Sequence, residues 1–207
     1  MKRLLLIGII ILGIIGATAM TGYFNKDTLR YNKYAPKDPL IDLTFEYPEK
    51  WNVFERRGSY GSFIQVQVVE PLAANDTTKE LASSISITIY PHSKAQFNPL
   101  SAQGLTEDIR KKRLSLKGCA LIQQSEIKVA GMIANDDQFA YEIFKVPLQA
   151  NAKPIAVIER VICFQRKDNY YAISLNETKE HFEAYKKIFD RIIRSIRFHE
   201  NPSSQRS

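Results

Sequence analysis

The chain has 207 residues, of which 44% are hydrophobic, so it has room for one domain of ordinary size with a core that needs no metal or disulfide support. Its formal net charge is +7, and +5 remains when the two cations at the N-terminus are set aside. This charge is moderate and is not concentrated in a basic arm, which argues against nucleic acid as a partner.

The N-terminus carries the features of an export signal. Lys2 and Arg3 precede an apolar run over residues 4–20, which would extend about 25 Å as a helix and is therefore short for a bilayer core of about 30 Å. Residues 17–19 (Ala-Thr-Ala) fit a signal-peptidase site, so residues 1–20 are either a cleaved signal peptide or an N-terminal membrane anchor. In both cases we expect the rest of the chain on the extracytoplasmic side of the membrane, anchored or secreted.

The remaining chain divides by composition. Residues 21–39 are polar, contain two prolines and show no steady hydrophobic period, so they are predicted to form a linker or stalk. Residues 40–198 are predicted to form the folded domain, and residues 199–207 a disordered tail.

Hydrophobic periodicity predicts the elements of this domain in chain order. Alternation with a period of two predicts strands, and recurrence at three and four residues predicts helices. Strands are expected at 43–47, 51–54, 63–69, 84–90, 120–129, 139–145, 155–164 and 170–175, and helices at 105–116 and 178–195. Asn135-Asp136-Asp137 is predicted to be a hairpin turn.

This order of elements predicts the fold class. Short turns favour antiparallel pairing, and two amphipathic helices need sheet faces to cover. The sequence therefore predicts an α+β fold, in which a curved antiparallel β-sheet is flanked by helices as an α/β/α sandwich. An N-terminal hydrophobic helix precedes it.

Three segments carry a resemblance to a known family. They are an opening strand with a Tyr-Pro turn and a tryptophan (residues 43–53), a middle strand segment (127–144), and a closing strand and helix (170–198). The chain resembles the PsbP-like family, which includes the PsbP proteins of photosystem II, exported DcrB-type proteins and, with the same fold, a Ran-binding nuclear import factor. The resemblance spans about residues 40–198. It implies a non-catalytic accessory or binding module with no cofactor.

The residues themselves offer no catalytic constellation. The three histidines, His92, His181 and His199, lie apart in the sequence and are best explained as surface residues, and no nucleophile elbow, P-loop or dinucleotide fingerprint occurs. Asn135-Asp136-Asp137 could offer carboxylates to a cation, but a turn explains these residues, so no metal site is predicted. Trp51 could stack on a ligand, although core packing is the favoured interpretation. The prediction is that the protein is not an enzyme.

A basic cluster on the first predicted helix is the main candidate binding site. It contains Arg110, Lys111, Lys112, Arg113 and Lys117. The ordinary interpretation is the solvated side of an amphipathic helix, whereas the functional one is attraction to anionic lipid headgroups or to an acidic partner. The first hypothesis is therefore a membrane-tethered or secreted module that docks to a membrane complex or envelope component. The sequence leaves the oligomeric state open.

The alternative function is that of a carrier or sensor for a small apolar molecule. Its pocket would be lined by four aromatic residues, Phe63, Tyr90, Phe139 and Tyr141. Cys119 and Cys163 could pair in an oxidising compartment or remain free thiols, and the sequence leaves both possibilities open.

Overall fold

The computed structural model describes residues 29–71, 83–92, 101–144 and 153–199. The chain divides into two units, Met1–Tyr31 and Asn32–Ser207, and the fold described here is that of the second unit and the strand at its start. The apolar helix predicted at residues 4–20 lies outside the described residues. Within the described ranges, no helix has both the length and the hydrophobicity to cross a bilayer.

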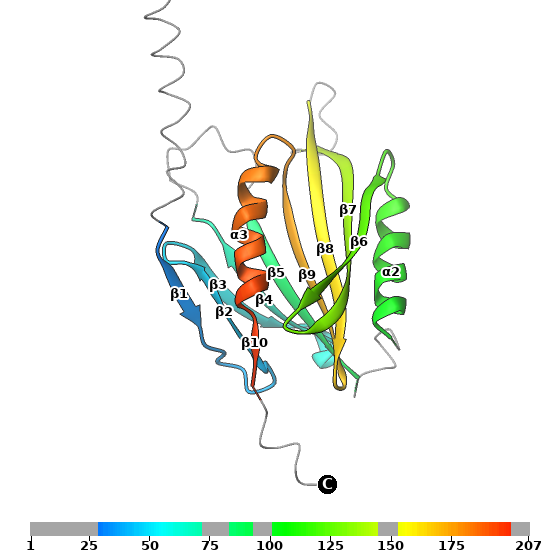
Figure 1. Ribbon diagram of the computed structural model, residues 1–207. Helices are drawn as coiled ribbons and strands as arrows, with labels where there is room; N and C mark the ends of the chain where they lie inside the picture. The colour runs from blue at the N-terminus through cyan, green and yellow to red at the C-terminus, as the bar shows by residue number, and fades with distance from the viewer. Residues whose placement is uncertain (1–28, 72–82, 93–100, 145–152, 200–207) are drawn as a thin grey trace, which may run out of the picture. The chain divides into compact units, whose positions relative to one another are not determined.

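The described strands form two sheets (Figure 1). All neighbouring strands of the larger sheet pair antiparallel. Its seven strands, in spatial order, are β3 (Asn52–Arg57), β4 (Ile64–Val69), β5 (Ser84–Pro91), β9 (Asn169–Thr178), β8 (Pro154–Arg166), β7 (Met132–Phe144) and β6 (Ala120–Val129). The smaller sheet contains β1 (Tyr31–Tyr34), β2 (Leu43–Pro48) and β10 (Arg197–Phe198). A short 3₁₀ helix, η2 (Ser59–Gly61), joins β3 to β4.

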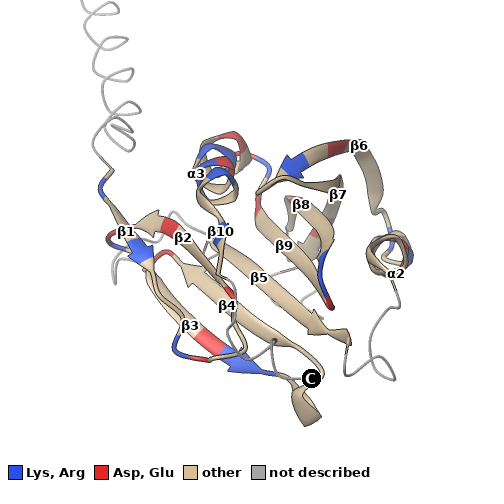
Figure 2. Cartoon of the chain, turned by 60° about the horizontal axis from the view of Figure 1, so that its bottom comes forward, with Lys and Arg blue, Asp and Glu red and all other residues tan. Residues whose placement is uncertain are grey.

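Two helices cover opposite faces of the seven-stranded sheet. Side chains alternate along β8, so Ile162 and Phe164 join a core cluster with helix α3 (Phe182–Ser195), whereas Val161 and Cys163 join a second cluster with helix α2 (Ala102–Leu114). The sheet curves between the two helices (Figure 2). The predicted antiparallel sheet flanked by helices is confirmed, and the burial of both faces of β8 explains its nearly continuous apolar run.

Helix α3 follows from its strong apolar stripe. Its residues Tyr185, Phe189 and Ile192 recur at helical spacing and are fully buried. The helix begins at Phe182, later than predicted, because β9 continues to Thr178, which pairs with Val157 of β8.

The predicted linker is wrong in its described part, because the fold begins before residue 40. Strand β1 ends at Tyr34, whose side chain is 5% exposed and stacks on Phe45 with ring centroids 4.7 Å apart. Asp38 accepts two hydrogen bonds from the Arg57 guanidinium of β3. Periodicity missed this segment because few of its side chains enter the core.

The predicted turn at Asn135-Asp136-Asp137 is also wrong. These residues lie inside β7, opposite Cys163, Ile162 and Val161 of β8 in register order. The β6–β7 hairpin turns instead at Ala130 and Gly131, which have φ values of 46° and 90°. Two consecutive residues with positive φ match the right-handed twist of a two-residue hairpin. Arginines rather than solvent neutralise the two carboxylates, as shown below.

Both cysteines are free thiols in the structure. Burial raises the pKa of the Cys163 thiol to about 12, and burial also raises the pKa of Cys119, which is only partly buried. We expect a thiol reagent to modify Cys119 first and Cys163 only after unfolding, because the thiolate is the reactive form. The measurement is a thiol titration without reductant, in native buffer and then in denaturant. Recovery of fewer than two thiols in denaturant would indicate a disulfide and contradict the structure.

Candidate functional site

Helix α2, which carries the predicted basic cluster, is fixed at its start by a cap and by one buried side chain. The hydroxyl of Ser101, the N-cap residue, accepts a hydrogen bond from the Gly104 amide at 2.9 Å. Leu105 is 3% exposed and anchors the helix in the second core cluster. The helix is only weakly amphipathic, so few apolar side chains hold it on the sheet.

Two arginines of the predicted basic cluster face the sheet. Arg110 donates to both carboxylate oxygens of Asp137, with Nε–Oδ2 and Nη2–Oδ1 distances of 2.7 and 2.9 Å. Arg113 donates to both oxygens of Glu159, with an Nη2–Oε1 distance of 2.7 Å. These hydrogen bonds raise the pKa of each arginine, and both carboxylates are 3% exposed. Two members of the cluster therefore neutralise buried carboxylates, so the five cations do not form one exposed surface.

A matching ion network lies on the other face of the sheet. Arg160 of β8 donates to Asp136 of β7 at 2.8 and 2.7 Å, and to Asp190 of α3 at 2.6 Å. Its guanidinium carbon lies 5.3 Å from the centroid of the Phe189 ring. On β7 and on β8, two charged residues that are adjacent in the sequence point to opposite faces of the sheet. The ion pairs on one face hold α2, and those on the other face hold α3.

The other cations of the cluster point to solvent. Lys111, Lys112 and Lys117 are exposed, and none of them makes an ion pair with a carboxylate among the described residues. Leu114 and Leu116 lie beside them with 48% and 44% of their surface exposed. We call these five residues the α2 outer surface. Helix α2 packs on one face of the sheet, mainly against β8 and β9, and α3 lies on the other face (Figure 2). The helix predicted at 105–116 ends at Leu114 in the structure, so Leu116 lies beyond the helix.

The four aromatic residues of the predicted ligand pocket lie under α2 and beside it. Phe139 is fully buried and Tyr141 is 9% exposed; both belong to the second core cluster, against which Tyr90 packs. The rings of Phe63 and Tyr90 have centroids 6.4 Å apart. Burial raises the pKa of Tyr141 to about 12, and its hydroxyl donates to Glu159 at 3.3 Å. A pocket at these residues stays a prediction, and Phe139 and Tyr141 have a packing role.

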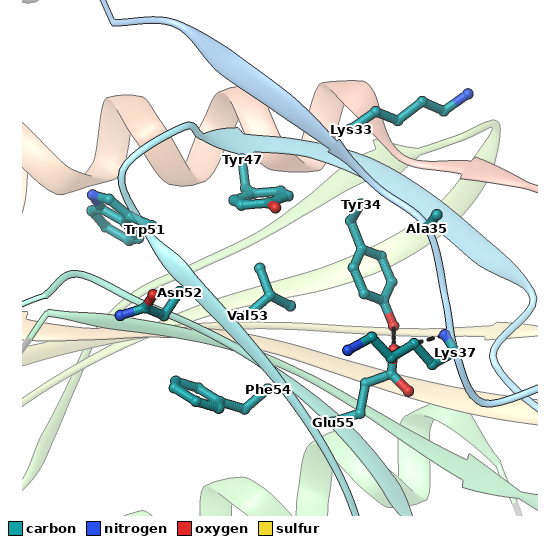
Figure 3. A pocket seen from close by; sticks show the side chains of 10 residues that line it. All are labelled: Lys33, Tyr34, Ala35, Lys37, Tyr47, Trp51, Asn52, Val53, Phe54 and Glu55. Atoms are coloured by element: carbon teal, nitrogen blue, oxygen red, sulfur yellow. Dashed lines mark hydrogen bonds between the residues drawn. The ribbon is translucent and has the colours of Figure 1, made fainter.

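A groove of about 790 Å³ lies elsewhere, between β1 and β3 (Figure 3). Tyr34, Tyr47, Trp51 and Phe54 are among the residues that line it. Sequence reasoning missed this groove because hydrophobic periodicity does not show which segments lie side by side in the fold. The sequence signal for it is Trp51, a possible ligand-stacking residue, which is 7% exposed at the groove wall.

The described histidines do not assemble a catalytic pair with a serine or cysteine. The Nδ1 atom of His92 lies 3.3 Å from the Tyr170 hydroxyl, His181 precedes α3, and His199 follows β10. Among the described residues, no three His, Cys, Asp or Glu side chains gather as a metal site. The arrangement found on α2 and in the groove is suited to binding surfaces and ligands.

Comparison with known proteins finds similarity only among solved structures. Neither the known family models nor the curated proteins match the sequence. A cyanobacterial PsbP (CyanoP) from Synechocystis shares 11% identity at a TM-score of 0.49, over 85% of this chain and 96% of its own. LpqN, involved in cell envelope biogenesis of Mycobacterium tuberculosis, shares 13% identity at a TM-score of 0.47, over 87% of this chain and 96% of its own. The Saccharomyces cerevisiae Ran-binding protein Mog1p shares 12% identity at a TM-score of 0.49, over 86% of this chain and 98% of its own.

The sequence resemblance names kinds of protein that recur among these structures. A PsbP and a Ran-binding protein are the kinds of protein that the resemblance named. At these identities the similarity concerns the fold alone and assigns no partner, location or activity to this chain.

Proposed function

We propose that this protein is a non-catalytic binding module at the extracytoplasmic surface of a membrane, and that it docks through the α2 outer surface to anionic lipid headgroups of the envelope. The observation that carries the proposal is the separation of charge on α2. Arg110 and Arg113 are turned inward to Asp137 and Glu159, whereas Lys111, Lys112 and Lys117 have no described ionic partner.

Electrostatics and apolar contact would act together at this surface. Each lysine near an anionic membrane contributes about 1 kcal/mol, and this attraction extends about one Debye length, or roughly 8 Å at physiological salt. The exposed Leu114 and Leu116 side chains would enter the boundary between headgroups and acyl chains, as apolar residues of interfacial helices do.

The apolar run at residues 4–20 supports the location. If it is retained as an anchor, it holds the domain near the bilayer at high effective concentration, so weak docking would suffice. If it is cleaved, the protein is released and the three lysines must supply the membrane attraction alone. N-terminal sequencing of the mature protein distinguishes the two forms.

Lysine footprinting tests the docking surface. The full chain is reconstituted in vesicles of phosphatidylcholine alone or with phosphatidylserine, labelled with an acetylating reagent, and analysed by mass spectrometry. Three lysines at about 1 kcal/mol each favour docking by about 3 kcal/mol, or roughly a hundredfold, so labelling of Lys111, Lys112 and Lys117 should be at least about tenfold slower on the anionic vesicles.

Lys128 and Lys187 are exposed on β6 and α3 and serve as internal controls, whose labelling should not change. High salt should abolish the protection, because it screens exposed charges. Equal labelling of all five lysines on both kinds of vesicle would contradict docking through α2.

A further inference from the structure

The groove between β1 and β3 lies at a free edge of the large sheet. Among the described strands, β3 is the outermost strand of the seven-stranded sheet and β1 is the outermost strand of the three-stranded sheet. β3 supplies four of the lining residues, Asn52 to Glu55. An outermost strand presents backbone N–H and C=O groups that no neighbouring strand pairs with, and such an edge is a template for another extended chain.

One end of the groove offers aromatic and apolar contact surface. Trp51 packs on Tyr185 with ring centroids 5.9 Å apart, which holds the indole in place at the wall. Phe54 of β3 is 55% exposed, and Tyr47 and Val53 are partly buried against the core (Figure 3). A fixed indole and partly exposed aromatic surface are typical of a site that binds apolar side chains.

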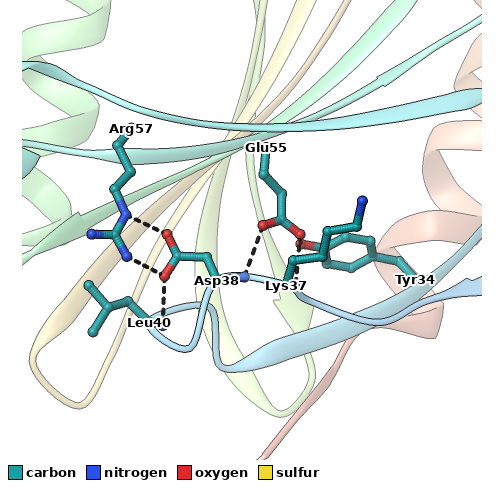
Figure 4. A network of polar contacts seen from close by, with 6 residues as sticks. All are labelled: Tyr34, Lys37, Asp38, Leu40, Glu55 and Arg57. Carbon is teal, nitrogen blue, oxygen red and sulfur yellow. Dashed lines mark hydrogen bonds and ion pairs between the residues drawn. The ribbon is translucent and has the colours of Figure 1, made fainter.

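The residues that line the groove include two lysines and one carboxylate, Glu55, so their net charge is positive. The hydrogen-bond donors to that carboxylate are uncharged groups. Glu55 Oε1 accepts from the Tyr34 hydroxyl at 2.6 Å and from the Lys37 amide at 2.9 Å, while Oε2 accepts from the Asp38 amide at 3.0 Å (Figure 4). Burial, together with Glu55, raises the pKa of the Tyr34 hydroxyl, so it stays a proton donor to that carboxylate.

Neither lysine side chain is paired with that carboxylate. Lys33 and Lys37 line the groove, are exposed, and form no ion pair with any carboxylate that the structure describes. Asp38 is not available to them, because both of its oxygens accept hydrogen bonds from Arg57. The excess of positive charge among the lining residues favours an anionic ligand.

We propose that this groove binds an extended acidic peptide segment of a partner protein. The segment adds to the free edge of β3, places its carboxylates near Lys33 and Lys37, and packs apolar side chains on Trp51. Addition of a strand to a sheet edge gives affinity through backbone hydrogen bonds and specificity through alternate side chains. A second copy of this chain fits less well, because it would bring the same two lysines to the groove.

This inference goes beyond the docking function of α2, since it concerns other residues and another class of ligand. Either one can fail alone. In a bilayer of phosphatidylcholine only, the α2 outer surface has no anionic headgroups to bind, so a response in the groove is measured separately.

Fluorescence of Trp51 reports directly on the groove, because it is the only tryptophan of the chain. The full chain in phosphatidylcholine nanodiscs is titrated with a synthetic nonapeptide of alternating acidic and valine residues. We expect a saturable change in the Trp51 emission. A peptide in which prolines replace the valines keeps the charge but lacks the N–H groups for strand pairing, and it should bind at least tenfold more weakly.

Charge reversal tests the role of the lysines. The double variant Lys33→Glu/Lys37→Glu should lower the affinity for the acidic peptide by about tenfold or more, since each attraction becomes a repulsion. The matched variant Lys128→Glu/Lys187→Glu makes the same change in net charge at exposed positions outside the groove, and it should bind as the unchanged protein does.

Three results would overturn the proposal: no saturable change in emission, equal loss of affinity in the two double variants, or equal binding of the proline peptide. Concentration-dependent self-association with the same emission change, and no response to the peptide, would assign the groove to a second copy and also overturn it.

Discussion

Substitution of Arg160 by alanine is expected to lower the free energy of unfolding by about 3 to 5 kcal/mol, the range for removal of one partner from a buried ion pair. Arg160 is 7% exposed and Asp136 is 2% exposed, so the change strands a carboxylate in the core. It also removes the link to Asp190 and the contact with the Phe189 ring, which hold α3 on the sheet. Urea denaturation followed by circular dichroism measures the effect.

The Arg191–Glu46 pair gives the matched control. Its closest N–O distance is 3.1 Å, and the two side chains are 49% and 47% exposed. Arg191→Ala should cost at most about 1 kcal/mol, because water already solvates these charges. Arg160→Met combined with Asp136→Leu should recover much of the lost stability, since it removes both buried charges together. Equal effects of the Arg160 and Arg191 variants would show that burial of the ion network is not what stabilises α3.

Substitution of Tyr34 by alanine should lower the free energy of unfolding by about 3 kcal/mol, the lower end for a large aromatic residue removed from a core. The side chain is buried, stacks on Phe45 and donates to Glu55. This change tests whether residues 31–39 belong to the fold, because the same substitution in a solvated linker would have almost no effect.

Lys33→Ala, one residue earlier on the same strand, provides the comparison. Lys33 is exposed, so its loss should change the stability by no more than about 0.5 kcal/mol. Thermal or urea unfolding of both variants gives the two values side by side. If the Tyr34 variant is as stable as the Lys33 variant, residues 31–39 do not belong to the fold and form a stalk, as the sequence pattern predicts.

The sequence predicts the elements of the fold well where one side of an element is apolar. The stripe that includes Tyr185 and Phe189 identifies α3, and alternation identifies β4 and β5, because burial of one face leaves a period in the sequence. The same reasoning fails for β1, where Tyr34 enters the core and its neighbours on the strand do not.

The candidate site shows a different limit of prediction. Arg110 and Lys111 are adjacent cations of the same kind in the sequence, yet one binds buried Asp137 and the other faces solvent. Their roles depend on carboxylates that another strand brings to the sheet face, and a single sequence does not contain that pairing. For the same reason, Asn135-Asp136-Asp137 was interpreted as a turn, although its carboxylates are the partners of the arginines.

The outward residues of α2 are the central claim, and a spin label at Leu116 tests it most directly. Leu116→Cys is labelled with a nitroxide in the Cys119→Ser background, where the buried Cys163 does not react. On vesicles with phosphatidylserine, we predict that the label at residue 116 loses mobility and gains contact with oxygen dissolved in the bilayer. The variant Lys111→Glu/Lys112→Glu/Lys117→Glu should abolish both changes. A label at residue 116 that behaves like one at Lys187→Cys on α3, on every vesicle tested, would contradict membrane docking through α2.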